Sequence, residues 1–282
     1  MRVSRTLHWA LLGGLLLALL LVPILRPLGP PPPLLASTTT SLVHTGLLDS
    51  LASNFTRETG TRMYFIPVGS GQAIELARRG DVDMALTHDP DLELAMVAEG
   101  YFTRTPFATN RFQVVGPPAD PAGVRGLDAA GTFRAIHDRN ATFVSRGDRS
   151  GTHAREQLLW KGAGYNYTTE ISVPSNAWYL SAGAGMGATL QKAFELGAYT
   201  LTDEGTYRSY RGRLDLDVLN PGDEPAFLNT YSVLLLNETR FPGKNHTPAK
   251  AFAEWLLSER GLGMVGAFGD GLFRPFRYAR EE

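Results

Sequence analysis

The feature that most limits the fold of this chain is a repeated change from a short apolar run, through a turn of Ser, Thr or Gly, to an amphipathic stretch. Met63–Val68 is typical of a strand, and after Ser70-Gly71-Gln72 it leads into a predicted helix over Ala73–Arg79. Further upstream, a helical face carries Leu47, Leu48, Leu51 and Phe55. Strands that alternate with helices in this way predict an α/β fold.

Two later apolar strands predict a division into two lobes. Phe112–Gly116 leaves the first set of strands and helices, and Thr230–Leu236 is a matching strand much further along. We therefore expect a discontinuous first lobe over residues 36–112 and 232–282, with a second lobe, residues 113–231, inserted between. Two crossing strands form a hinge, and ligand sites favour the cleft between such lobes.

The N-terminus predicts export. Arg2 and Arg5 precede an apolar run from Trp9 to Leu25, a pattern typical of a secretory signal or signal anchor within residues 1–35. Glycosylation acceptor patterns agree with an extracytoplasmic location. They lie at Asn54, Asn140, Asn166, Asn237 and Asn245.

Composition excludes several functional classes. The chain has no cysteine, so disulfides, iron–sulfur clusters, thiolate zinc sites and cysteine nucleophiles are excluded. With 27 basic and 28 acidic residues the formal net charge is -1, and nothing indicates a nucleic-acid partner.

Four turns rich in hydroxyls or glycine stand where a predicted strand meets a predicted helix. The first turn of a helix offers free N–H groups and the positive end of the helix dipole, which favour an anion. Hydroxyls add donors, and glycine lets the backbone approach closely. One such turn is an ordinary helix cap, but four around two lobes predict convergence on an anion. They are Ser37–Ser41, Gly69–Gly71, Ser145–His153 and Gly183–Thr189.

The turn SRGDRSGTH, residues 145–153, carries the most specific chemistry. Arg146 is a planar, permanently charged donor suited to two oxygens of an oxyanion. Ser150, Gly151 and Thr152 fall at a predicted helix start. Asp148 either orients Arg146 or accepts a proton from a protonated ligand. The alternative is a surface loop with an exposed ion pair, which contributes about 0–1 kcal/mol.

These motifs together resemble the tungstate-binding, TupA-type proteins of ABC uptake systems, a branch of the type II periplasmic binding proteins. The resemblance covers nearly the whole chain after the leader and implies a two-lobed fold whose hinge has two crossing strands. The matching stretches are TTTS (38–41), TGLLD (45–49), VGSGQA (68–73), GDVD (80–83), His88-Asp89-Pro90, AEGY (98–101), VVGPPADPAG (114–123), SRGDRSGTH, GMGATL (185–190) and AYTLTDEGTY (198–207).

The resemblance implies a monomeric, extracytoplasmic binding protein that holds tungstate or molybdate, needs no cofactor and delivers the anion to an ABC permease. Ser181 and Ala184 depart from the longer polar residues expected of the family around the GMGAT turn, which bears on fine selectivity. The implied anion contacts are Thr39, Thr40, Ser70, Arg146 and Thr152, with Gly71, Ser150, Gly151 and Gly187 in addition and Asp148 behind Arg146.

Three alternatives stay open. Phosphate-binding proteins use a similar Arg-x-Asp-x-Ser-Gly-Thr arrangement, in which an acceptor carboxylate suits a ligand that carries a proton. A sensor or scavenger could use the same site without a transporter. A secreted phosphoester hydrolase would need Ser150 as nucleophile with His153 as base, although His153 should point away from an anion at the helix start. His44, His88 and His153 lack metal-ligand spacing, so we expect no metal centre. No set of nucleophile, base and orienting group is visible in the sequence, so we expect no enzyme.

Overall fold

The computed structural model describes residues 32–276, and the residues from Pro33 onward form one compact unit. The predicted signal segment, residues 1–35, lies outside the described residues except for its last four positions. None of the helices within residues 32–276 is long and apolar enough to cross a membrane.

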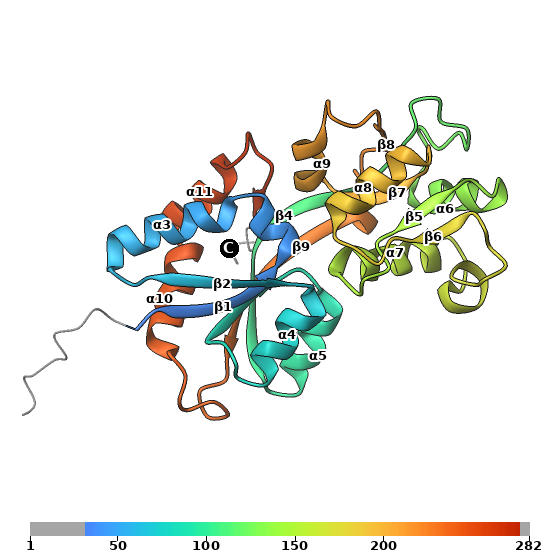
Figure 1. Ribbon diagram of the computed structural model, residues 1–282. Helices are drawn as coiled ribbons and strands as arrows, with labels where there is room; N and C mark the ends of the chain where they lie inside the picture. Colours follow the sequence, from blue (N-terminus) through green and yellow to red (C-terminus); the bar gives the residue numbers. More distant parts are fainter. Residues whose placement is uncertain (1–31, 277–282) are drawn as a thin grey trace, which may run out of the picture. The chain divides into compact units, whose positions relative to one another are not determined.

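A mixed sheet forms the centre of the fold, with strand order β10–β4–β9–β3–β1–β2 (Figure 1). β1 runs parallel to β2 and β3, whereas β9 runs antiparallel to β3 and β4. The α/β class predicted from the alternating pattern is therefore confirmed. The strands are β1 (Leu34–Thr39), β2 (Met63–Val68), β3 (Met84–Thr87), β4 (Phe102–Gly116), β9 (Leu228–Leu236) and β10 (Arg274–Pro275).

Helices cover both faces of this sheet. Leu34 and Ala36 pack into one apolar core, and Leu35 between them packs against another. Successive side chains of a strand point to opposite faces, so each face needs its own helical cover. One face is covered by α3 (Leu47–Thr59), α10 (His246–Leu257) and α11 (Glu259–Ala267), and the other by α4 (Ser70–Arg78) and α5 (Pro90–Ala98).

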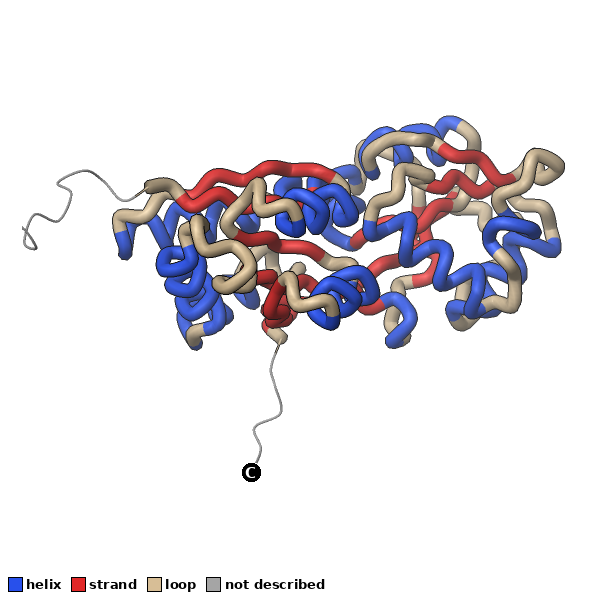
Figure 2. The backbone as a smooth tube through the Cα atoms, turned by 90° about the horizontal axis from the view of Figure 1, so that it is seen from below, coloured by secondary structure: helices blue, strands red, loops and turns tan. Residues whose placement is uncertain are grey.

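The far end of β4 continues into a second group of elements (Figure 2). There it pairs antiparallel with β7 and β8, while β5 and β6 form a separate parallel pair. The elements of this group are β5 (Phe143–Ser145), β6 (Tyr179–Ser181), β7 (Thr200–Asp203), β8 (Asp217–Asn220), α6 (Ala129–Asp138), α7 (Gly151–Gly162), α8 (Met186–Glu195), α9 (Glu204–Tyr210), a π-helical turn (Tyr167–Ile171) and a 3-10 turn (Pro225–Phe227).

Buried apolar residues divide in the same way. Two cores draw on residues 34–108 and 231–273, and two others draw on residues 112–227. We call the parts around them the first lobe and the second lobe. Phe112 packs in the second lobe and Tyr231 in the first, each one residue across the boundary expected from the sequence. That the lobes move about a hinge stays a prediction.

The structure corrects where two helices begin. β1 continues to Thr39, and α2 (Thr40–His44) follows at once because the Thr39 hydroxyl accepts from the Leu42 N–H. α4 begins at Ser70 rather than Ala73, since Gly69 takes the extended conformation of a helix cap. Both shifts move hydroxyl and glycine residues from loops into first helical turns.

Side-chain burial confirms most of the predicted apolar faces. The four predicted residues of α3 are all buried, and Trp178 and Tyr179 pack in a core of the second lobe. On α8, the helical spacing of Leu190, Ala193 and Phe194 predicts a stripe that faces the core, which is wrong for Phe194 because its side chain is 39% exposed.

Glu156 makes the stability of the second lobe depend on pH. Its carboxylate is buried, where it accepts from the Tyr179 hydroxyl at 2.6 Å and the Trp160 indole at 3.2 Å. Burial outweighs these bonds and raises the pKa of Glu156 to about 7. The folded chain therefore keeps a proton that the unfolded chain releases, so stability is lost as pH rises from about 4.5 to 7.

We expect Glu156→Gln to remove this loss. Because the pKa rises from 4.5 to about 7, the wild type should lose about 2–3 kcal/mol more than the variant between pH 5 and pH 8. Urea unfolding at both pH values measures the difference, with the exposed Glu195→Gln as the matched control. Parallel pH profiles for the wild type and Glu156→Gln would contradict the assignment.

Candidate functional site

The starts of α4 and α7 meet across the two lobes. A Cβ added to Gly151, the first residue of α7, would lie 2.9 Å from the Ser70 hydroxyl at the start of α4. It would also lie 2.7 Å from Cε1 of His88, which follows β3. On the other side of that ring, the Ser41 hydroxyl in α2 lies 3.4 Å from Nε2 of His88. The three predicted turns around α2, α4 and α7 are thus brought together.

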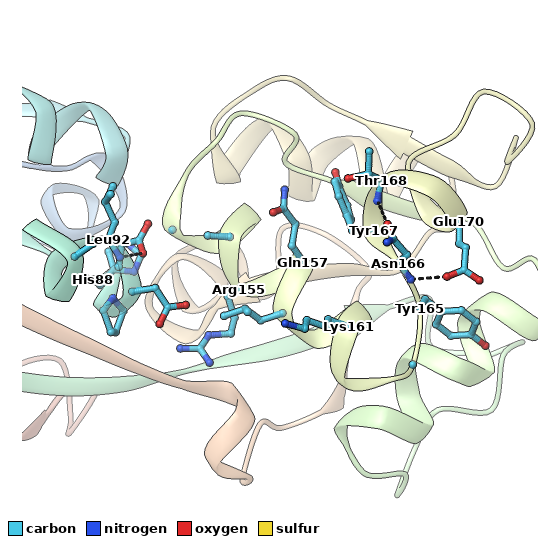
Figure 3. A pocket seen from close by; sticks show the side chains of 18 residues that line it. His88, Leu92, Arg155, Gln157, Lys161, Tyr165, Asn166, Tyr167, Thr168 and Glu170 are labelled. Carbon is cyan, nitrogen blue, oxygen red and sulfur yellow. Dashed lines mark hydrogen bonds between the residues drawn. The ribbon is translucent and has the colours of Figure 1, made fainter.

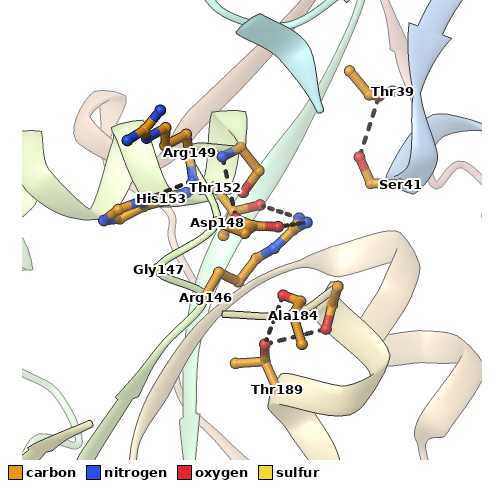
Figure 4. Close-up of polar contacts among 12 residues, drawn as sticks. Thr39, Ser41, Arg146, Gly147, Asp148, Arg149, Thr152, His153, Ala184 and Thr189 are labelled. Atoms are coloured by element: carbon orange, nitrogen blue, oxygen red, sulfur yellow. Dashed lines mark hydrogen bonds and ion pairs between the residues drawn. The ribbon is translucent and has the colours of Figure 1, made fainter. Parts of the chain in front are cut away.

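Arg146 lies buried beside these helix starts, with 4% of its surface exposed. It donates to Asp148 and, at 3.4 Å, to the Thr152 hydroxyl (Figure 4). The other oxygen of Asp148 accepts from the Ser150 N–H at 3.1 Å. Both carboxylate oxygens are therefore engaged within the turn, and Asp148 holds the guanidinium in place.

The turn needs glycine at position 147. Gly147 has φ +61°, and a Cβ there would fall 1.7 Å from the Ser181 hydroxyl. Only glycine fits a left-handed conformation with so close a neighbour. The backbone can therefore fold back, which brings Arg146 and Asp148 to the start of α7.

Three buried donors around the site have no hydrogen-bond partner among the described residues. They are the hydroxyls of Thr38 and Ser70 and the Nε–H of Arg146. Leaving such a group unpaired costs about 1–3 kcal/mol, and native structures rarely accept that cost without a functional reason. Donors that lie together with an unused hydrogen suit a ligand that offers only acceptors.

The remaining predicted contacts are spread over the same helix starts, with one exception. Thr39 caps α2 and lies 3.3 Å from the Ser41 hydroxyl, and Thr40 follows it half-buried. Gly71 is in the first turn of α4, with nothing within 4 Å of the position of a Cβ. Gly187 lies in the first turn of α8, where a Cβ would fall 2.1 Å from the Tyr210 hydroxyl of α9, and its part in anion binding stays a prediction.

Sequence reasoning missed the part that His88 has in this site. Its ring is buried, with Nδ1 2.8 Å from the Asn229 carbonyl oxygen on β9. Burial lowers the pKa of His88 to about 4, so the ring is neutral at ordinary pH. The position of His88 in the sequence could have indicated this role. It directly follows a fully buried strand, and ligand-binding residues of α/β proteins gather at the ends of such strands.

His153 is turned away from the start of α7, as expected. Its Nε2 lies 2.8 Å from the Tyr167 hydroxyl and 3.1 Å from the Gln157 amide, while Nδ1 accepts from the Arg149 N–H. The Ser150 hydroxyl accepts from the His153 N–H and caps the helix. Within residues 32–276 no group of three or more His, Asp or Glu side chains could hold a metal ion.

A cavity of about 920 Å³ opens between α5 and α7 and ends at His88 and Gly151 (Figure 3). Arg155, Gln157 and Lys161 line it from α7. It is far larger than a tetrahedral oxyanion, and it reaches the ring of His88 and the first residue of α7.

The glycosylation acceptors differ in their surroundings. Asn140, Asn166 and Asn237 are exposed, whereas the side-chain amide of Asn54 donates to the Ser50 carbonyl and that of Asn245 to Asp83. Glycan attachment at any of the five stays a prediction.

Comparisons with known proteins agree with this fold and site. Residues 29–260 match the family model of a PBP superfamily domain. A putative ABC transporter anion-binding protein of Haloferax volcanii is 40% identical over 248 residues, which cover 85% of this chain and 70% of that protein. The tungstate-binding protein TupA of Peptoclostridium acidaminophilum is 38% identical, with 83% of this chain and 80% of that protein covered.

Solved structures give the same result. The tungstate-binding protein TupA of Desulfovibrio alaskensis superposes with a TM-score of 0.75 at 40% identity, covering 88% of this chain and all of that one. The fold and site define a solute-binding protein of the PBP superfamily. Within that superfamily, the chain belongs to the TupA family.

Proposed function

We propose that this chain binds tungstate, with molybdate as the nearest substitute, and delivers it to an ABC permease. The observation that carries the proposal is the buried Arg146, whose carboxylate partner Asp148 has both oxygens engaged. The anion would lie among Arg146, Thr152 and the first turns of α2, α4 and α7. Gly71 and Gly151 would contribute backbone N–H groups, Ser150 would contribute its hydroxyl proton, and Thr39, Thr40 and Ser70 would contribute N–H groups and hydroxyls.

The chemistry of the site favours a dianion without a proton. The unpartnered groups of Thr38, Ser70 and Arg146 are all able to donate. A ligand that carries a proton, as phosphate does near neutral pH, needs an acceptor, and each oxygen of Asp148 already accepts one bond, from Arg146 or from Ser150, which leaves less of the carboxylate for such a proton. Tungstate and molybdate offer four oxygens that only accept.

The geometry favours binding without turnover. The Ser150 hydroxyl caps α7, and both ring nitrogens of His153 already have partners away from it. A nucleophile needs a base within hydrogen-bond reach, and this pair does not supply one. The TupA relatives are named as tungstate-binding proteins.

The proposed extracytoplasmic location and the proposed ABC permease partner follow from the same assignment as a tungstate-binding protein. The leader within residues 1–35 would export the chain or anchor it, and a monomer would present the closed lobes to the permease. An anion sensor or scavenger would use the same site without a permease. Uptake is favoured because one relative is described as an ABC transporter anion-binding protein.

Calorimetric titration of residues 33–282 with tungstate, molybdate, phosphate and sulfate tests the proposal. We expect submicromolar tungstate binding, with molybdate next and phosphate at least a hundredfold weaker, a difference of about 2.7 kcal/mol. Tighter binding of phosphate than of tungstate would instead support the assignment as a phosphate-binding protein. No heat with any of the four anions would exclude oxyanion binding.

Asp148→Asn separates the tungstate and phosphate assignments further. We expect tungstate affinity to change by less than about tenfold, or 1.4 kcal/mol, because the amide oxygen can still accept from the Ser150 N–H. A phosphate proton donated to Asp148 would instead make the substitution cost about 10- to 150-fold in phosphate affinity. The same titrations measure both values.

A further inference from the structure

A buried hydrogen-bond chain fixes where the proton of His88 lies. The Asn229 amide nitrogen donates to the Asn110 carbonyl oxygen at 2.8 Å and to the Tyr231 hydroxyl at 2.9 Å. With its N–H groups used on β4 and β9, Asn229 offers its oxygen to Nδ1 of His88 at 2.8 Å. Nδ1 therefore carries the proton, and Nε2 of the neutral ring has a lone pair.

That lone pair is directed at the hydroxyls of the anion site. Nε2 lies 3.4 Å from the Ser41 hydroxyl, which lies 3.3 Å from the Thr39 hydroxyl. While His88 is neutral, Ser41 donates to it. The Ser41 proton is then turned away from the anion, and the ring offers a lone pair where a bound oxyanion needs donors.

Burial and the charges around His88 favour its neutral form. Burial, Arg146 and Arg155 lower its pKa, whereas the bond to Asn229 acts in the opposite direction. The charged and titratable groups on the elements around the ring are Arg146 before α7, Arg155 on α7, Asp89 before α5, Asp203 before α9 and Tyr231 on β9.

A bound dianion acts in the opposite direction, because it favours the protonated form of His88. Arg146 is already paired with Asp148, so a dianion brings two further negative charges to a buried ring on which Arg146 and Arg155 are the cations that act. A negative charge within a few Å favours the charged form of a base. His88 is the base whose ring edge lies against Gly151 and Ser41, where the anion would lie.

We propose that His88 takes up one proton from solvent when the oxyanion binds, and that this turns the Ser41 hydroxyl toward the anion. The proton adds to Nε2, the imidazole becomes an imidazolium, and no bond of the oxyanion breaks. Nε2–H then donates to the Ser41 oxygen, which frees the Ser41 proton for the ligand. The inference rests on the proposed oxyanion binding and adds a residue that positions a donor and links affinity to pH.

Calorimetry in two buffers with different ionisation enthalpies measures the proton. At about pH 6, near the ordinary pKa of histidine, we expect the wild type to take up between about half a proton and one proton per tungstate. His88→Gln should bind more weakly and take up none. His153→Gln is the matched control, because His153 is also partly buried near Arg146 but is bonded to Tyr167, and it should behave as the wild type.

Observing the His88 ring directly in the wild-type protein gives a test that does not depend on whether His88→Gln folds. Imidazole nitrogen spectra of the wild type should show a neutral His88 without ligand and an imidazolium with tungstate at the same pH. Tungstate binding without proton uptake, or uptake that persists in His88→Gln, would overturn the inference and leave the proposed function intact. Absence of binding to any of the four anions would instead remove the function on which the inference rests.

Discussion

Replacing Arg146 with alanine is expected to weaken tungstate binding by about 30- to 4,000-fold. Truncating one partner of a buried charge pair costs about 2–5 kcal/mol, much of it from the charge left unpaired. Here the anion would lose its guanidinium donors, and Asp148 would lose the partner that neutralises it. The variant therefore loses the attraction between Arg146 and the anion, and the unpaired carboxylate of Asp148 repels the anion.

Calorimetry on the variant measures the loss, and Arg149→Ala is the control. Arg149 belongs to the same turn and carries the same charge, but it is exposed and only its backbone N–H is bonded. A long-range effect of charge would weaken both variants alike, whereas a direct contact affects only Arg146. Wild-type affinity in Arg146→Ala would exclude Arg146 as an anion contact.

Gly151→Ala should weaken tungstate binding by about 5- to 150-fold while the protein stays folded. The added methyl would lie 2.7 Å from Cε1 of His88 and 2.9 Å from the Ser70 hydroxyl, both in the first lobe. Overpacking of this kind costs about 1–3 kcal/mol. If the lobes open at the predicted hinge, opening would relieve the overlap without unfolding either lobe, and the cost would fall on the proposed closed, anion-bound state.

Gly162→Ala is the matched control for this substitution. It makes the same change at the other end of α7, where nothing lies within 4 Å of the new Cβ. Small-angle scattering supplies a second measurement, because tungstate should compact the wild type and Gly162→Ala but not Gly151→Ala. Equal affinity and equal compaction in all three proteins would contradict a closing contact at Gly151.

Local patterns were sufficient to predict the elements of this fold. The face of Leu47, Leu48, Leu51 and Phe55 is buried as predicted, because helical spacing alone places these side chains together. The misplaced start of α4 has a local cause as well. Glycine caps such as Gly69 leave no side-chain signal, so the sequence pattern alone did not mark the first turn.

The binding turns were predictable to the extent that their chemistry is contained in a few consecutive residues. Arg146, Asp148, Ser150 and Thr152 lie within seven positions, and the bonds among them are local. Gly187 was selected by the same reasoning, and its close neighbour is the Tyr210 hydroxyl. A glycine in a first helical turn serves packing or ligand approach equally well, and only its neighbours in space decide which.

By itself, the sequence determined the α/β class, the helix starts rich in donors, and the turn that joins Arg146 to Asp148. These features depend on contacts between residues a few positions apart. Only the tertiary structure decided that His88, Asn229 and Asn110 form one chain, since the partners lie 141 and 119 residues apart. It also decided that Gly151 meets Ser70 and His88. Contacts between β3, β4, β9 and α7 arise from strand order and lobe packing, which no local pattern encodes.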